Sequence, residues 1–364
     1  MQLRIPGPTP CPERVLRATA QPMINHRGPE FAQLIQRATA RLQELFQTKN
    51  DVFLLTASGT GGMEAAIVNT LSPGQKVLAV TNGYFSERFA AIAQAFGAQV
   101  VRLDFPWGQA ASPQAVKKAL EEDPAISTVI LVHNETSTGL TNPLEELAKV
   151  VKAQDRLLIV DAISSLGSLD LPVDAWGVDV VITGSQKGWM APPGLAMVGV
   201  SPRAWEAHRQ ARMPRFYWDF SQAKKFLEKS QTPWTPPLPV LFGLADALEM
   251  MAQEGLPKIL ARHRRVGDTV RQGVKDLGLE LFPDAKYASN TVTCIQAPPG
   301  VEVKGLLKYL REEEQIVLAG GQGKLEGKTF RIGHLGWVTE EDGKAVIAGL
   351  GRALARAGFA PSRR

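Results

Sequence analysis

Short apolar runs alternate with longer amphipathic segments between about residue 50 and residue 200. The apolar runs predict seven β-strands, at 52–56, 76–80, 99–105, 128–132, 157–160, 178–183 and 196–200. The segments between them have helix-like spacing of apolar residues and predict helices at 62–71, 87–96, 113–122 and 143–153. This alternation predicts an α/β fold with a doubly wound, mostly parallel, seven-stranded sheet.

The pattern changes after residue 200. Aromatic and proline-rich stretches at 216–220 and 232–239 predict an extended loop, because proline removes backbone donors from strands and helices. A long helix is predicted next, from about 240 to 271 with a break near Gly255, and a tail of mixed helical and strand-like runs follows. We therefore expect three parts: an N-terminal arm (1–19), a large ligand-binding domain (20–257) and a smaller C-terminal α+β domain (258–364).

Composition narrows the class of protein. The chain has 364 residues, more than the ~250 to 300 that one hydrophobic core usually serves, which agrees with two domains. Hydrophobic residues make up 44% and charged residues 21%, as in an ordinary globular protein. The net charge of +5 favours small anionic ligands, but the basic residues are scattered among acidic ones. We therefore expect no nucleic-acid partner.

The positions of the cysteines and the lengths of the hydrophobic runs indicate the cellular compartment. Cys11 and Cys294 are far apart, with no second Cys or His at metal-ligand spacing, so neither a disulfide framework nor a metal site is expected. The N-terminus lacks an apolar stretch of signal-peptide length, and no run approaches the ~20 residues of a membrane span. The sequence predicts a cytoplasmic protein of a reducing compartment, without a membrane partner.

An amine and a carboxylate close two of the predicted strands. Asp161 ends the run 157–160, and Lys187 follows the run 178–183. Because the carboxyl ends of neighbouring parallel strands open on one crevice, both groups can serve one bound molecule. A desolvated lysine has a lowered pKa and can react with an aldehyde, and a carboxylate can hold a pyridinium nitrogen. The pair indicates pyridoxal phosphate, although a surface lysine and a turn cap are the ordinary alternatives.

A glycine-rich turn follows the first predicted strand. Residues 56–62, Thr-Ala-Ser-Gly-Thr-Gly-Gly, lead directly into a helix, where backbone N–H groups and the helix dipole favour an anion. The turn lacks both the Lys-Ser/Thr ending of a nucleotide P-loop and the spacing of a dinucleotide fingerprint. It predicts a cradle for one phosphate, with a plain tight turn as the alternative.

Three further residues are candidates for the same crevice. Phe85 follows a strand end and fits a ring-stacking position, or the core. Thr136 follows the next strand end and is placed to contact a cofactor. Arg331 lies on a strand-like run of the small domain and fits bidentate binding of a substrate carboxylate, or a surface salt bridge. His26 and Arg27 receive no role beyond a place near the entrance.

Five motifs occur along the chain in one order. They are Ser-Gly-Thr at 58–60, Glu-Thr-Ser-Thr-Gly at 135–139, Val-Asp-Ala-Ile-Ser-Ser-Leu-Gly at 160–167, Gly-Ser-Gln-Lys at 184–187 and Phe-Arg-Ile-Gly at 330–333. Each is weak alone. As an ordered set covering nearly the whole chain, they resemble the class V, fold-type I pyridoxal phosphate-dependent aminotransferases, in particular the alanine-glyoxylate and serine-glyoxylate (serine-pyruvate) branch.

The resemblance implies a role for each matching position. Lys187 would join the cofactor covalently, Asp161 would hold its pyridine nitrogen, Phe85 would stack on its ring, and Thr136 would face the ring's hydroxyl side. Ser58, Gly59, Thr60 and Gln186 would bind the phosphate, and Arg331 would take the substrate carboxylate. The resemblance also implies a homodimer with a shared active site, in which Thr235 reaches the phosphate of the neighbouring subunit.

The chain departs from the family pattern at three positions. Phe85 stands where the animal enzymes often have tryptophan, Thr60 where they have histidine, and Thr232 where they have a tyrosine near the interface loop. These differences bear on substrate preference. The segment 25–31 looks more like the bacterial serine-glyoxylate type.

The function that the resemblance implies is a ping-pong transamination from a small amino acid, serine or alanine, to glyoxylate or pyruvate, with no metal. Aspartate and ureidoglycine are alternative donors. One rival is a lyase or desulfurase on the same fold, but Cys294 lies in an apolar strand and Gln186 stands where desulfurases carry a histidine. The other rival is a non-catalytic α/β subunit of a larger complex.

Overall fold

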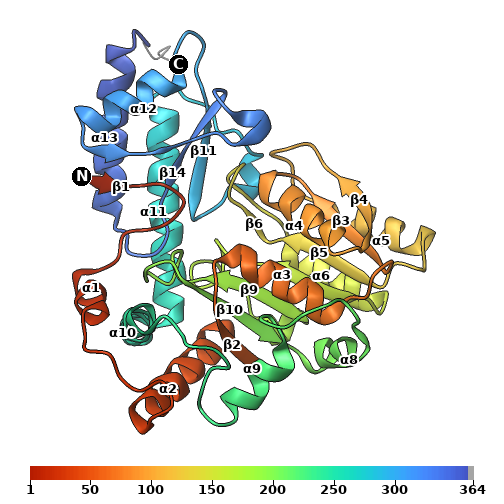
Figure 1. Ribbon diagram of the computed structural model, residues 1–364. Coiled ribbons are helices and arrows are strands. Elements are labelled where there is room, and N and C mark those ends of the chain that lie inside the picture. Colours follow the sequence, from red (N-terminus) through yellow and green to blue (C-terminus); the bar gives the residue numbers. More distant parts are fainter. Residues whose placement is uncertain (360–364) are drawn as a thin grey trace.

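The computed structural model describes residues 1–359 and is built around one large sheet (Figure 1). The order of its seven strands is β2-β10-β9-β8-β5-β3-β4, and only β10 runs antiparallel to its neighbours. Their bounds are β2 Asp51–Thr56, β3 Lys76–Thr81, β4 Gln99–Asp104, β5 Thr128–Val132, β8 Leu157–Asp161, β9 Val180–Gly184 and β10 Leu195–Val200. The predicted α/β fold with a mostly parallel seven-stranded sheet is confirmed.

Both faces of this sheet are buried except at the partly exposed edge strand β4, which is why the other six strands read as nearly continuous apolar runs. Successive side chains alternate between two hydrophobic clusters, as in β8, where Leu158 and Val160 face one and Leu157 and Ile159 the other. Helices α2, α5 and α6 contribute to the first cluster, and α3 and α4 to the second. The helices before residue 200 are α1 Glu13–Thr19, α2 Pro29–Phe46, α3 Gly59–Thr70, α4 Tyr84–Ala95, α5 Pro113–Glu122, α6 Leu144–Ala153 and α7 Val173–Trp176.

Helices α3 and α4 begin earlier than predicted, at Gly59 and Tyr84 instead of 62 and 87. Each starts inside a turn of small or polar residues, which carry no apolar periodicity. A short hairpin of β6 (Asn134–Glu135) and β7 (Leu140–Thr141) was also not predicted. These early starts bring the first helical turns close to the strand ends.

The stretch after residue 200 is only partly an extended loop. It contains two helices that the sequence analysis missed, α8 (Pro202–Gln210) and α9 (Phe220–Leu227). Ser201 and Asp219 could have indicated these helices in the sequence, because both are common N-cap residues. In the structure each side chain accepts a hydrogen bond from the first turn of its helix. Residues 228–237 form no helix, and α10 begins at Leu238.

Two long helices lead into the C-terminal part. The break predicted near Gly255 is present, since α10 (Leu238–Glu254) ends there and α11 (Leu256–Asp276) follows. A third hydrophobic cluster lies among residues 266–354. The remaining elements are β11 Val292–Gln296, α12 Val303–Glu312, β12 Ile316–Val317, β13 Ala319–Gly320, β14 Thr329–Gly333 and α13 Glu340–Arg356, with short 3₁₀ turns η1 Ala285–Tyr287 and η2 Gly323–Leu325. Strands β11, β14 and β13 form a small antiparallel sheet.

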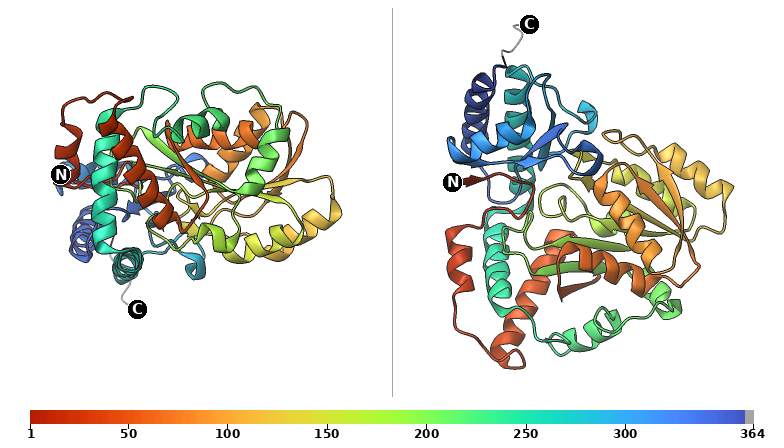
Figure 2. Two further views of the ribbon diagram at one scale, coloured as in Figure 1. Left: turned by 90° about the horizontal axis from the view of Figure 1, so that it is seen from below. Right: turned by 45° about the horizontal axis from the view of Figure 1, so that its top comes forward.

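The N-terminal segment lies between the C-terminal elements and the large sheet (Figure 2). Strand β1 (Gln2–Leu3) pairs in parallel with β12, and the carbonyl of Arg4 accepts a hydrogen bond from Gly333 at the end of β14. Further along the arm, the N–H of Thr9 donates a hydrogen bond to the carbonyl of Gln186, which lies in the loop after β9 of the large sheet. The arm is therefore bonded to both parts of the chain.

Candidate active site

Lys187 lies in the loop after β9 and points at the N-terminal arm. Its Nζ donates a hydrogen bond to the carbonyl of Pro6 at 2.7 Å. The Thr9 hydroxyl donates to the Lys187 carbonyl at 3.0 Å, so the arm holds both ends of this residue. Gly7 has φ +141°, and a Cβ there would overlap the Lys187 amine. The backbone conformation favours glycine at this position, and any side chain there would displace the end of Lys187.

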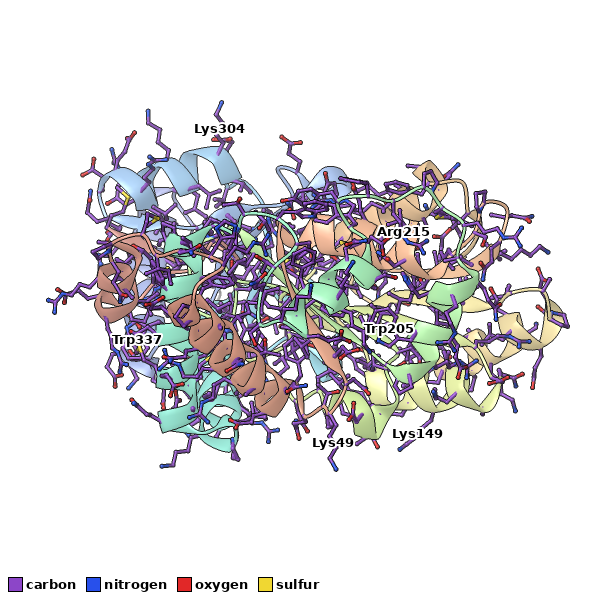
Figure 3. All side chains as sticks on the ribbon, turned by 60° about the horizontal axis from the view of Figure 1, so that its bottom comes forward. Lys49, Lys149, Trp205, Arg215, Lys304 and Trp337 are labelled. Carbon is purple, nitrogen blue, oxygen red and sulfur yellow. The ribbon has the colours of Figure 1, made fainter. Side chains whose placement is uncertain are left out.

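The environment of Lys187 differs from that of most lysines in the chain. Lys49, Lys149 and Lys304 project outward into solvent (Figure 3), whereas Lys187 retains only partial exposure. Desolvation lowers the pKa of Lys187 to about 8, Asp161 opposes this shift, and the nearby charges of Arg331 and Arg88 reinforce it. About a tenth of the amine is therefore neutral at pH 7, far more than of an ordinary lysine.

Asp161 ends β8, next to β9, and is buried with 3% exposure. Burial, and to a smaller extent the charge of Glu135, raise its pKa to about 7. A hydrogen bond from the Ile163 N–H, 2.8 Å from Oδ1, acts in the opposite direction, as do the charges of Lys187 and Arg88. The turn-capping role is thus present as well. The second carboxylate oxygen has no protein donor within residues 1–359, so the group can hold a cationic ligand.

The glycine-rich turn places an uncapped helix N-terminus at the same sheet edge. Ser58 is the N-cap of α3 but makes no side-chain capping bond, and the first turn of α3 has no acidic residue. Its free N–H groups and dipole therefore favour an anion. Gly59 lies against Ile163, which follows Asp161, because a Cβ on Gly59 would lie 2.5 Å from Ile163 Cδ1.

Gln186 brings an unpaired amide to this turn. Its Oε1 is buried without a hydrogen-bond partner, and both this oxygen and the Gly59 nitrogen lie against Gly184. A buried amide without a partner is costly, so its presence indicates a ligand. Rotation of the amide by 180° would present its N–H₂ group instead, which suits an anion.

Two residues that the sequence analysis missed organise the start of α4. Glu135 is fully buried, and its carboxylate accepts hydrogen bonds from the N–H groups of Phe85 (3.3 Å) and Ser86 (2.9 Å) and from the Ser137 hydroxyl (2.6 Å). Arg88 lies over the Phe85 ring at 4.9 Å and donates to Thr60 Oγ1 at 3.4 Å. Thus Phe85 and the glycine-rich turn are joined through Arg88.

Arg331 and Thr136 meet across the two parts of the chain. Arg331, on β14, is 5% exposed, and its Nη1 donates to the Thr136 carbonyl at 3.3 Å. The Thr136 hydroxyl donates to Ser164 Oγ at 2.7 Å, three residues after Asp161. Burial lowers the pKa of Arg331. Its guanidinium is therefore a desolvated cation beside the strand-end turn of Thr136 and not a surface salt bridge.

Thr235 is not part of this group of side chains. It is exposed and lies in the loop before α10. Arg27 holds that loop, because its guanidinium donates to the carbonyls of Thr232 (2.6 Å) and Pro233 (3.1 Å). His26 is half-buried, and no side-chain hydrogen bond of it occurs within residues 1–359.

Other kinds of site find little support in the part of the chain that the structure describes. No group of three or more His, Cys, Asp or Glu side chains there is arranged to hold a metal ion. No helix between residues 1 and 359 is both long enough and apolar enough to cross a bilayer. Burial raises the pKa of the Cys294 thiol to about 11, which makes it a poor nucleophile.

Known proteins resemble this chain over nearly its whole length. Residues 5–332 match the family Aminotransferase class-V. The chain is 45% identical to the soluble hydrogenase small subunit of a Synechococcus strain, over 98% of this chain and 94% of that protein. It is 39% identical to the serine–glyoxylate aminotransferase of Methylorubrum extorquens, over 95% and 89%. The crystal structure of an alanine–glyoxylate aminotransferase from Nostoc sp. superimposes with a TM-score of 0.93 at 33% identity, over 97% and 94%.

Proposed function

Because the chain belongs to the class V aminotransferases, as its motifs predicted, we propose that it is a pyridoxal phosphate-dependent transaminase. It would transfer an amino group from a small amino acid, serine or alanine, to glyoxylate or pyruvate in a ping-pong cycle. The observation that carries this proposal is the pair of perturbed groups at adjacent strand ends, Lys187 with a lowered pKa and Asp161 with a raised one.

The residues of the crevice fit pyridoxal phosphate. The unpaired amide of Gln186 and the uncapped start of α3 at Ser58, Gly59 and Thr60 fit its phosphate. Asp161 has a free carboxylate oxygen for the pyridine nitrogen, and Phe85 offers an aromatic face at the start of α4. Thr136 fits the hydroxyl side of the ring.

Two residues of the chain would then act on the substrate, one by proton transfer and one by binding its carboxylate. When bound, the cofactor supplies an electron sink beside the substrate's Cα. Lys187, whose lowered pKa makes the neutral amine accessible near pH 7, takes the proton from Cα and later returns a proton, acting as general base and then as general acid. Arg331 holds the substrate carboxylate and so fixes which Cα bond faces the lysine.

A homodimer with a shared site is part of the proposal. Phe216 and Tyr217 expose 77% and 43% of their surface, and both stack on Trp234, next to Thr235. An exposed aromatic cluster of this kind supports a protein–protein contact. Thr235 would then reach the phosphate of the neighbouring subunit. Light scattering should give twice the chain mass, and Thr235→Ala should weaken cofactor binding in the dimer.

The decisive experiment is covalent trapping. Borohydride reduction of the protein loaded with pyridoxal phosphate should attach one cofactor per chain, at Lys187, and mass spectrometry of the peptides identifies the position. Lys187→Ala should abolish turnover and leave the fold intact, whereas Lys149→Ala, an exposed lysine, is the matched control. Half-reactions with serine, alanine, aspartate and ureidoglycine, each followed by a panel of keto acids, identify the donor and acceptor.

One alternative rests on the relative named as a hydrogenase subunit, which favours a non-catalytic role in a larger complex. The desolvated Lys187 opposes it, because keeping an amine in such a place is costly without a function. Protein that neither binds pyridoxal phosphate nor traps it would favour this alternative. A lyase or desulfurase is opposed by the buried Cys294, and sulfide release from cysteine faster than transamination of serine would favour it.

A further inference from the structure

The guanidinium of Arg331 is almost fully engaged within the protein. Its Nε and Nη2 donate to the carbonyl of Gly320 at 3.1 and 2.8 Å, and its Nη1 donates to the Thr136 carbonyl at 3.3 Å and to Gln322 Oε1 at 2.9 Å. These four bonds use four of the five N–H groups of an arginine, which leaves one on Nη2. A carboxylate that binds two N–H groups must therefore displace one of these acceptors.

None of these acceptors is charged. No carboxylate within residues 1–359 forms an ion pair with Arg331, although the side chain is 5% exposed. A buried cation that is surrounded only by neutral oxygens gains much more from an anion than from an amide, because bonds between two charged groups are the stronger ones. The arrangement therefore favours exchange of a neutral acceptor for an anion.

Gln322 is the only one of the three acceptor residues that binds through a side chain. Its backbone is held on both sides: the N–H of Gly321 donates to the Thr329 carbonyl at 2.8 Å, and the Gln322 carbonyl accepts a hydrogen bond from the N–H of Leu325 at 3.1 Å. Gln322 is half-buried, and its Nε2 has no acceptor among the described residues. Side-chain rotation thus releases Arg331 at the cost of a single hydrogen bond, whereas moving Gly320 or Thr136 would disturb a strand or a strand-end turn.

We propose that Gln322 is a placeholder for the substrate carboxylate, which occupies one N–H of Arg331 in the free protein and gives it up when an amino or keto acid binds. This inference rests on the proposed function, in which Arg331 receives that carboxylate. Gln322 then sets the affinity for every carboxylate substrate, because each must compete with its amide. Its contribution acts on binding and not on the chemical step.

The test uses propionate, a carboxylate without an amino group, titrated into the full-length protein in a calorimeter with and without pyridoxal phosphate. Gln322→Met keeps the length of the side chain and removes the acceptor, so its Kd for propionate should fall about threefold to tenfold. Gln322→Glu supplies a permanent anion to Arg331, so its Kd should rise at least about tenfold. Lys328→Gln, an exposed position of the same loop with the same change of charge, should bind as wild type.

Three results would overturn the proposal. They are weaker propionate binding by Gln322→Met, unchanged binding by Gln322→Glu, and a Lys328→Gln variant that reproduces the effect of Gln322→Glu. Absence of propionate binding in wild type and Gln322→Met alike would also overturn it. The calorimetric shifts do not require turnover, so loss of the proposed transaminase activity with these shifts intact would refute the activity and leave the placeholder role standing.

A second measurement separates a placeholder from a residue that merely shapes the site. Alanine carries the carboxylate, and ethylamine is the same amine without it. In the protein loaded with pyridoxal phosphate, the Gln322 variants should change the apparent affinity for alanine in the same directions as for propionate and leave that for ethylamine within about twofold. Equal changes for both amines would refute competition for Arg331.

Discussion

Attachment of pyridoxal phosphate to Lys187 should depend on pH in a way that the surroundings of this amine determine. Only the neutral amine attacks an aldehyde. With a pKa of about 8 in place of 10.5, about 9% of Lys187 is neutral at pH 7, against about 0.03% of an ordinary lysine, an advantage of about 300-fold. The rate of attachment should therefore rise about tenfold per pH unit up to about pH 8 and then level off.

The charge of Asp161 leads to a second prediction about the pH profile. Because the pKa of Asp161 is about 7, the group is mostly ionised where Lys187 titrates, and its charge raises the pKa of the amine. Asp161→Asn should therefore shift the plateau to lower pH. Asp170→Asn, at an exposed position, should leave the profile unchanged.

The assay is stopped-flow absorbance of the cofactor-free protein mixed with pyridoxal phosphate from pH 6 to 10. Borohydride trapping confirms the position of attachment. The same reaction with a lysine derivative free in solution gives a reference pH profile. Because the cofactor titrates in both reactions, the difference between the two profiles reports on Lys187 alone. A rate that keeps rising past pH 9 would refute the desolvation argument, and a plateau that moves to higher pH in Asp161→Asn would refute the role given to the Asp161 charge.

Three other perturbations test the structure around the site. Gly7→Ala should cost about 1–3 kcal/mol in urea unfolding and slow cofactor attachment, whereas Gly74→Ala, with φ +78° and open space around it, should show only the backbone cost. Glu135→Gln should cost about 1–3 kcal/mol, because four donors, the N–H groups of Phe85, Ser86 and Ser137 and the Ser137 hydroxyl, lose a buried charged acceptor, and this reasoning is wrong if unfolding is unchanged. The ion pair of Lys324 with Glu87 is largely exposed, so a double-mutant cycle should give a coupling below about 1 kcal/mol that vanishes in high salt.

The sequence predicted that Lys187 and Asp161 lie at one edge of the sheet, and the structure has Asp161 at the end of β8 and Lys187 in the loop after the neighbouring strand β9. Their roles with a cofactor stay predictions. The side chains that surround these two residues could not be predicted from the strand pattern. Glu135 contacts the start of α4 about 50 residues earlier in the chain, and Arg88 reaches Thr60 on another helix. Such contacts depend on how helices pack, for which periodicity carries no signal.

The regions with few apolar residues were also the hardest to predict. Gln322 lies in a loop of glycine and charged residues, and its contact with Arg331 depends on the path of that loop. The helices α8 and α9 were missed because aromatic and proline residues around them dominated the pattern. The boundary between the domains near residue 258 stays a prediction, as does the role of Thr235, which involves a second subunit.

The N-terminal arm has a consequence for how the protein folds. Residues 2–9 are bonded to residues 315–333 and to the loop of Lys187, so these contacts join segments that are distant in the sequence. They form only when a very long loop has closed, which makes them late contacts in folding. The surroundings of the reactive amine are therefore completed only after β12 and β14 have formed.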